Sequence, residues 1–317
     1  MKTGQDARYA KGIALCLASA LLFALLGPFG KNARDAGAST ATMLSMRFGI
    51  AAVILVLVVG LTRRSFPRGR ALILAALLGA GGYCLQSLFY FTALKTLSIG
   101  VVSLLLYLFP LIVVAVSVAL GRTPPTWTIL LATILAVGGV ALTMLGGQQR
   151  TSIVGMLFGV GAALVYSAYF FGIEALPASA DRIAVAAVIC ASAAISHFVI
   201  GSVNGTFDLG TMNLAAWSWT IALSTACTFL PIVLLLSGMT LTKAATASLI
   251  CCAEPVAAVL IGAAFYGDAF GWPQVVGTIA VVGAVVLLEL RGRRAAVSAA
   301  DSADLAVGPE PVGDSRG

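Results

Sequence analysis

The stretch Lys243–Tyr266 reads KAATASLICCAEPVAAVLIGAAFY and places Glu254 and Pro255 near the middle of an apolar run. A run of this length can cross a bilayer as a helix. A carboxylate at bilayer depth costs about 3 kcal/mol or more, so it marks a functional site by default. Pro255 removes a backbone donor and crowds the carbonyl of Cys251, which leaves a polar gap in the helix. The stretch therefore indicates a membrane helix that carries a site near its midplane.

The rest of the chain has the same character. Of 317 residues, 60% are hydrophobic and 10% are charged, with a mean hydropathy of +1.04. A soluble domain has about 25% charged residues. The short loops leave no room for an inserted soluble domain, so we predict an all-α integral membrane protein. The ten apolar runs lie near 12–30, 40–62, 70–92, 98–120, 126–146, 153–176, 183–203, 214–238, 243–266 and 271–290.

Basic residues predict the orientation of these helices. If the N-terminus is cytoplasmic, 14 Lys and Arg residues fall on the inner side, and 4 fall outside: Lys31, Arg34, Lys95 and Arg150. We therefore expect a multi-pass protein of the plasma (inner) membrane with both termini in the cytoplasm. The net charge of +7 reflects this loop bias, and we expect no nucleic-acid partner.

Two halves of the chain repeat the same pattern. Pro110 and Pro255 are 145 residues apart, and so are Trp127 and Trp272. Five helices per half is an odd number, so the second half must enter the membrane from the opposite side, a recurring transporter design. The predicted organisation is a cytoplasmic N-terminus (1–11), a first five-helix repeat (12–146), a second, inverted repeat (153–290) and a disordered cytoplasmic tail (291–317).

Several short motifs give the pattern a family resemblance. They are Arg47-Phe48, Ala93-Leu94, Ser248-Leu249, Glu254-Pro255-Val256 and Gly267-Asp268. With them, residues 10–290 resemble the EamA type of the drug/metabolite transporter superfamily. The resemblance implies a ten-helix, monomeric carrier of small metabolites, often an exporter of amino acids or related compounds.

Two charged residues inside the predicted helices are the leading site candidates. Glu254 could bind a substrate amine, or take up and release a coupling proton, or simply make a structural hydrogen bond between helices. Arg47 could bind a substrate carboxylate through its guanidinium fork or pair with Glu254. Its alternatives are extension toward the outer headgroups and a scaffold contact to free carbonyls.

Polar side chains at helical spacing predict the lining of a substrate cavity near the helix breaks at Pro110 and Pro255. Such residues also hold membrane helices together without binding a ligand, so both interpretations stay open. The candidates are Tyr83, Gln86 and Tyr90; Ser103 and Tyr107; Tyr166 and Tyr169; and Thr220, Ser224 and Thr228.

These features favour a secondary transporter that exports a small metabolite such as an amino acid, by alternating access and with possible proton coupling. The aromatic candidates would also suit a planar or cationic solute, so a multidrug or quaternary-ammonium exporter is the alternative. A uniporter or a channel without ion coupling is the third possibility. We expect no enzyme activity, metal or cofactor, because the sequence has one histidine, no metal-ligand spacing and no Walker motif.

Overall fold

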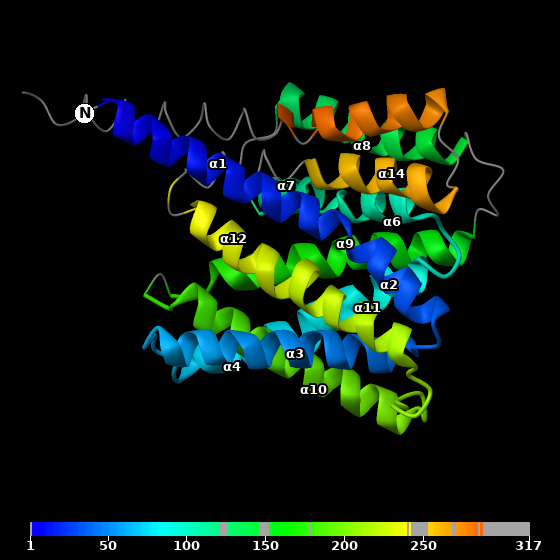
Figure 1. The fold of residues 1–317 in the computed structure, drawn as a ribbon. Coiled ribbons are helices and arrows are strands. Elements are labelled where there is room, and N and C mark those ends of the chain that lie inside the picture. Colours follow the sequence, from blue (N-terminus) through cyan, green and yellow to red (C-terminus); the bar gives the residue numbers. More distant parts are fainter. Residues whose placement is uncertain are drawn as a thin grey trace, which may run out of the picture.

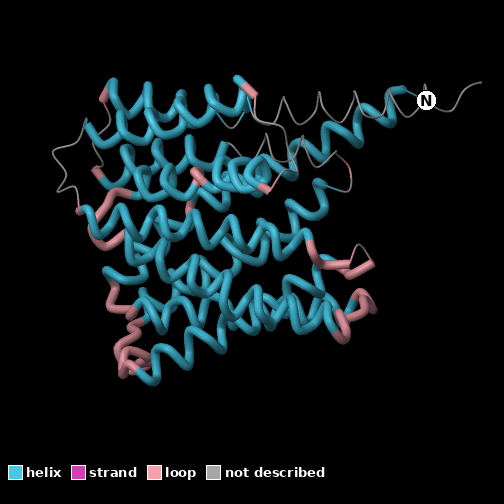
Figure 2. The backbone as a smooth tube through the Cα atoms, turned by 180° about the vertical axis from the view of Figure 1, so that it is seen from behind, coloured by secondary structure: helices cyan, strands magenta, loops and turns pink. Residues whose placement is uncertain are grey.

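The protein is a bundle of helices. The computed structural model describes residues 2–120, 126–145, 152–177, 179–239, 241, 253–267, 271–284 and 286–287. Within these ranges all regular structure is helical, and the helices run side by side across the bundle (Figures 1 and 2). In Figure 1, α3, α4 and α10 lie at one side of the bundle, and α8 lies at the other.

The described helices follow the ten predicted segments in order, and several segments are divided in two or three. In chain order the segments are α1 (Lys2–Ala24) with α2 (Leu26–Asp35); α3 (Thr40–Leu61); α4 (Arg70–Leu77) with η1 (Leu78–Tyr83) and α5 (Cys84–Ala93); α6 (Ile99–Leu106) with α7 (Phe109–Ala119); α8 (Trp127–Leu145); α9 (Ile153–Glu174); α10 (Arg182–Val203); α11 (Leu214–Ser224) with η2 (Thr225–Phe229) and α12 (Leu230–Met239); α14 (Ala253–Tyr266); and a last helix over 272–284.

The outer surface of the bundle is apolar. On α3, for example, Val53, Leu57 and Leu61 are exposed, whereas Arg47 and Phe48 are buried. This arrangement is the reverse of a soluble helix and suits a lipid surround. Six helical stretches are long and apolar enough to cross a membrane: Ala10–Asp35, Thr40–Leu61, Arg70–Ala93, Ile153–Ile173, Arg182–Val203 and Leu214–Leu235.

The second segment of each repeat shows that the repeats are inverted. Arg64, after the end of α3, pairs with Asp181 at the start of α10. At the other end of the bundle, the Thr42 hydroxyl near the start of α3 donates to the Asp208 carbonyl beyond the end of α10, and it accepts from the Asp208 amide. The two helices are therefore antiparallel, as an odd number of crossings per repeat requires.

The remaining packing follows the same pseudo-symmetry. The first segment of each repeat packs on the third segment of the other, as α1 on α12, α2 on α11 and α9 on α5. The fourth segments meet as α6 and α14. The fifth segments meet where Gly139 lies against the Gly277 carbonyl, with no room for a side chain between the backbones.

Irregular backbone interrupts several segments. The first segment is broken at Leu25, between α1 and α2, three residues before Pro28. A turn at Tyr107–Leu108 divides α6 from α7, directly before Phe109 and Pro110. The third segment of each repeat contains a π-helix, η1 or η2. Such interruptions free backbone groups and often lie at functional sites.

Candidate functional site

Arg47 is buried in the middle of the bundle. It lies on the inward face of α3, with 1% of its surface exposed. Its Nε donates to Thr228 Oγ1 at 2.8 Å, and its guanidinium lies 4.6 Å from the centre of the Phe48 ring. Its Nη2 has no hydrogen-bond partner in the described part of the chain, and none of the ion pairs seen there includes it. Arg47 therefore does not extend toward the headgroups.

The π-helix η2 explains the contact with Thr228. The Thr228 hydroxyl donates to the Leu223 carbonyl, five residues back, at 3.1 Å. Its single proton is used in that bond, so its lone pairs are free to accept the Arg47 Nε–H. The Ser224 hydroxyl likewise donates within its own segment, to the Thr220 carbonyl, but the described contacts do not link it to a charged residue. Of the predicted stripe on this segment, Thr228 is the member that reaches a charged candidate.

Glu254 is held by a tyrosine from the other repeat. Tyr107, at the break between α6 and α7, donates through its hydroxyl to Glu254 Oε2 at 2.9 Å. The glutamate lies near the start of α14 and is partly exposed, although it stands inside an apolar helix. One turn before Tyr107, the Ser103 hydroxyl lies 3.3 Å from the Tyr90 hydroxyl. These contacts bring the predicted candidates of segments three, four and nine together.

A continuous row of rings leads from Arg47 to Glu254. We call it the aromatic row, and each ring contacts the next with centroids 4.7 to 6.0 Å apart. The predicted candidates Tyr166 and Tyr169 form its centre, where they stack nearly parallel. In order, the members are Phe48, Tyr83, Tyr169, Tyr166, Phe109 and Tyr107.

The two charged residues face this row without pairing with each other. In the described residues, Arg47 bonds Thr228 and Glu254 bonds Tyr107. Tyr83 interacts electrostatically with both charges and also forms a side-chain hydrogen bond with Arg47. Tyr90 interacts electrostatically with both charges. The possibility that Arg47 pairs with Glu254 is therefore not realised in this structure. The arrangement is a cationic and an anionic group joined by a row of aromatic rings.

Some predicted site residues make no described contact with Arg47 or Glu254, and the side chains of others lie outside the described residues. Gln86 is buried in α5, but the described contacts link it to neither charge. Thr220 is fully buried with its hydroxyl unpartnered among the described residues. Pro110 and Pro255 lie in the first turns of α7 and α14, and their side chains fall outside the described residues.

Sequence reasoning missed two residues of this region, His197 and Ser87. His197 of α10 is buried, and its Nε2 lies 2.9 Å from Ser87 Oγ. Its ring stacks on Phe48 with an interplanar angle of 1°. Histidine is seldom placed in an apolar helix without a partner, and that rarity was the available signal.

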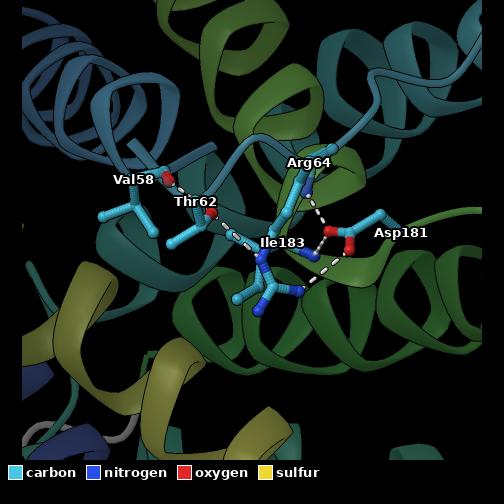
Figure 3. A network of polar contacts seen from close by, with 6 residues as sticks. Val58, Thr62, Arg64, Asp181 and Ile183 are labelled. Carbon is cyan, nitrogen blue, oxygen red and sulfur yellow. Dashed lines mark hydrogen bonds and ion pairs between the residues drawn. The ribbon is translucent and has the colours of Figure 1, made fainter. Parts of the chain in front are cut away.

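A second arginine marks one rim of the bundle. Arg64 Nη1 lies 2.9 Å from Asp181 Oδ2, and Asp181 Oδ1 caps α10 by accepting from the Ile183 and Ala184 amides (Figure 3). Partial burial alone would raise the pKa of the Asp181 carboxyl. The bonds from Ala184, Arg64 and Ile183 outweigh burial, and the pKa lies below its usual value. This contact joins the two repeats outside the apolar interior.

Two inverted helical repeats with an apolar exterior and charged groups inside define an integral membrane transporter. The chain belongs to the EamA-like transporter family, whose model matches residues 10–145 and 153–290.

Similar proteins agree with this assignment. An "Uncharacterized transporter" of Archaeoglobus fulgidus is 26% identical over 200 residues, which cover 62% of this chain and 70% of that protein. The "Uncharacterized inner membrane transporter YicL" of Salmonella typhimurium is 25% identical over 223 residues, 69% of this chain and 73% of that one. A solved crystal structure covers 90% of this chain and 98% of its own with a TM-score of 0.63. Its identity of 18% limits the likeness to the fold.

Proposed function

We propose that this transporter exports a small zwitterionic metabolite, an amino acid or an analogue, by alternating access. The supporting observation is the pair of interior charges, Arg47 and Glu254, joined by the aromatic row. The free Nη2 of Arg47 would bind the substrate carboxylate. Glu254 would bind the amine, and the row would cover the rest of the solute.

Both charged residues are held across the boundary between the repeats. Arg47 of the first repeat bonds Thr228 of the second, and Glu254 of the second bonds Tyr107 of the first. A rocking motion of one repeat against the other would change both contacts together. This placement supports alternating access at the boundary between the repeats, since the contacts that hold the site are the ones that the motion would alter.

Glu254 would also couple export to protons. Its carboxylate cannot hold a proton and a substrate ammonium group at once, because protonation removes the negative charge that attracts the amine. Proton entry from outside would then release the substrate, and proton loss inside would restore the site. The basic-residue count supports the orientation, with both termini in the cytoplasm, and we propose a monomer in the inner membrane.

Inverted membrane vesicles test this proposal. The vesicle lumen is acidified, a pH-sensitive dye is followed, and L-amino acids, benzoate or tetraethylammonium are added. Dye recovery with amino acids, lost in Glu254→Gln and kept in the rim variant Arg64→Gln, would support proton antiport of a zwitterion. Recovery that persists in Glu254→Gln would remove the coupling role. No recovery, with radiolabelled counterflow still present, would indicate a uniporter, and a large unitary conductance would indicate a channel.

The aromatic row favours one alternative function. Stacked tyrosine faces attract organic cations, so a quaternary-ammonium or multidrug exporter would also use Tyr83, Tyr166 and Tyr169. Arg47 separates the two functions. An amino-acid exporter needs its positive charge, whereas a cation exporter would tolerate or gain from Arg47→Gln. Stronger tetraethylammonium-driven dye recovery in that variant would favour the cation exporter.

A further inference from the structure

We propose that His197 is a positioning residue that holds Arg47 in its carboxylate-binding geometry by way of Phe48. This inference rests on the proposed function only in assigning a carboxylate to Arg47. The imidazole is 1% exposed and stacks on Phe48 with ring centres 5.6 Å apart. The same Phe48 ring supports the guanidinium at 4.6 Å. The phenyl ring is thus shared between the histidine and the arginine.

Ser87 fixes the histidine. The Ser87 hydroxyl lies 2.8 Å from the Tyr83 carbonyl and 3.0 Å from the Cys84 carbonyl, and its single proton must be donated to one of them. The serine oxygen therefore accepts from the Nε2–H of His197. Ser87 lies in α5, one turn after η1 ends at Tyr83, so this contact anchors His197 to the third segment directly beyond its π-helix.

Arg47 is anchored in a matching way. Its Nε bonds Thr228 within η2, the π-helix of the eighth segment. Segments two and eight therefore make the arginine contact, and their counterparts in the other repeat, segments seven and three, make the histidine contact. Phe48 joins the two. Thr228 of η2 supplies the hydroxyl that bonds Arg47, Ser87 of α5 supplies the one that bonds His197, and both anchored side chains contact the Phe48 ring.

This stack explains how the guanidinium can stay ordered without a bonded partner on Nη2. A free arginine side chain has about 2 kcal/mol of rotamer entropy, which must be lost each time a ligand is bound. Phe48 and Thr228 restrict the side chain beforehand, and His197 keeps the Phe48 ring from turning. A histidine that only fills space would leave Arg47 unchanged when it is replaced by another residue of suitable volume.

The first test observes Arg47 without any solute. In protein labelled with ¹⁵N-arginine, the Arg47 Nε–H signal is identified by its loss in Arg47→Lys, and its exchange with water is measured. We expect His197→Leu, which removes the ring, to speed this exchange about tenfold, within the range of a lost cation–π support. His197→Phe keeps a flat ring but loses the bond to Ser87, so the exchange should rise by about threefold, less than in His197→Leu. Unchanged exchange in folded His197→Leu would overturn the proposal.

If His197→Leu does not fold, a second variant provides the test. Ser87→Ala leaves the imidazole in place and removes its anchor, so exchange at Arg47 should rise by about threefold, the smaller part of one hydrogen bond. Exchange equal to that of the wild type would overturn the proposal in the same way.

The transport test compares radiolabelled L-phenylalanine with L-phenylalaninamide, which lacks the carboxylate. His197→Leu should raise KM for L-phenylalanine about tenfold with little change in Vmax, the pattern of lost uniform binding. KM for the amide should stay the same. His197→Phe should bring KM for L-phenylalanine back toward its wild-type value. An equal rise for both solutes would overturn the positioning role. If the wild type transports neither solute, the proposed function fails for them, and the exchange test alone decides the role of His197.

Discussion

Two arginines of one segment have opposite surroundings. Arg64, just beyond the end of α3, is 40% exposed and forms an ion pair with Asp181. Arg47, in the interior of the same helix, is 1% exposed and is unpaired with any carboxylate that the structure describes. The exposed arginine, whose charge is solvated by water, has a carboxylate partner. The buried arginine, whose charge is desolvated, has none among the described residues.

The energetics of the two positions suggest what each arginine does. An exposed ion pair contributes about 1 kcal/mol at most, so Arg64 serves local structure. An arginine at the bilayer centre costs about 3 kcal/mol or more to insert. Phe48 and Thr228 offset part of that cost for Arg47. An unpartnered Nη2 on a charge inserted at such a cost is consistent with the carboxylate ligand proposed above.

The largest effect should come from removing the buried charge. We expect Arg47→Met to lower kcat/KM for a carboxylate solute about a hundredfold or more, the loss typical of a buried charge contact. The melting temperature should stay equal or rise, because an apolar side chain replaces a desolvated charge and Thr228 keeps its bond to Leu223. Transport assays and thermal melts on the purified protein measure the two quantities. Arg64→Met is the matched control, and a lower melting temperature for Arg47→Met than for this control would make Arg47 structural.

The next largest effect should come from the partner of Glu254. Tyr107→Phe keeps the ring in the aromatic row and removes the hydroxyl that donates to Glu254. Loss of a hydrogen bond to a charged group predicts a fall in proton-coupled transport of about tenfold to thirtyfold. Dye recovery in vesicles gives the coupled rate, and counterflow gives the uncoupled exchange. Equal losses in both would mean that the bond only holds α6 and α14 together.

A smaller effect should come from the scaffold of Arg47. Thr228→Val has nearly the same shape but leaves the Arg47 Nε–H without its acceptor. We expect KM for a carboxylate solute to rise about fivefold to tenfold, as for one lost hydrogen bond to a charged donor. Thr228→Ser keeps the hydroxyl and should behave as the wild type. If the valine and serine variants are alike, Thr228 does not orient Arg47.

Much of this architecture was predictable because membrane helices are long and their constraints are local. Apolar length predicts the segments, and the 145-residue spacing of Pro110 and Pro255 predicts the repeat. A buried charge is conspicuous in an apolar helix, so Arg47 and Glu254 stand out at once.

The contacts among these residues could not be predicted. The spacing of Tyr83, Gln86 and Tyr90 fits one face of a regular helix, but η1 ends at Tyr83, and Tyr83 and Tyr90 have different neighbours. Tyr83 contacts Phe48, and Tyr90 contacts Ser103. The meeting of His197 with Ser87 spans 110 residues of chain, and no periodicity within a helix reports such a pairing.

The smallest effect should come from the rim pair, and it should depend on pH. The bonds from Ala184, Arg64 and Ile183 lower the pKa of Asp181 against its partial burial, so the folded state favours the ionised carboxyl. Its stabilisation is therefore complete above the unfolded pKa, about 4, and is lost as the pH falls through the lower folded-state pKa. Asp181→Ala should cost about 1 kcal/mol of stability at neutral pH, the usual value of a helix cap, and less in acid.

Thermal melts of the wild type and Asp181→Ala between neutral and acid pH measure this difference, and transport at neutral pH should be nearly the same in both. Asp181→Asn is the matched control, because asparagine caps a helix without a titrating charge. A transport loss in Asp181→Ala as large as that in Thr228→Val would contradict the purely structural role of the Arg64 pair. The Arg64 pair would then be part of the moving contact between α3 and α10, since it joins the two repeats at the rim as Thr228 joins them at the centre.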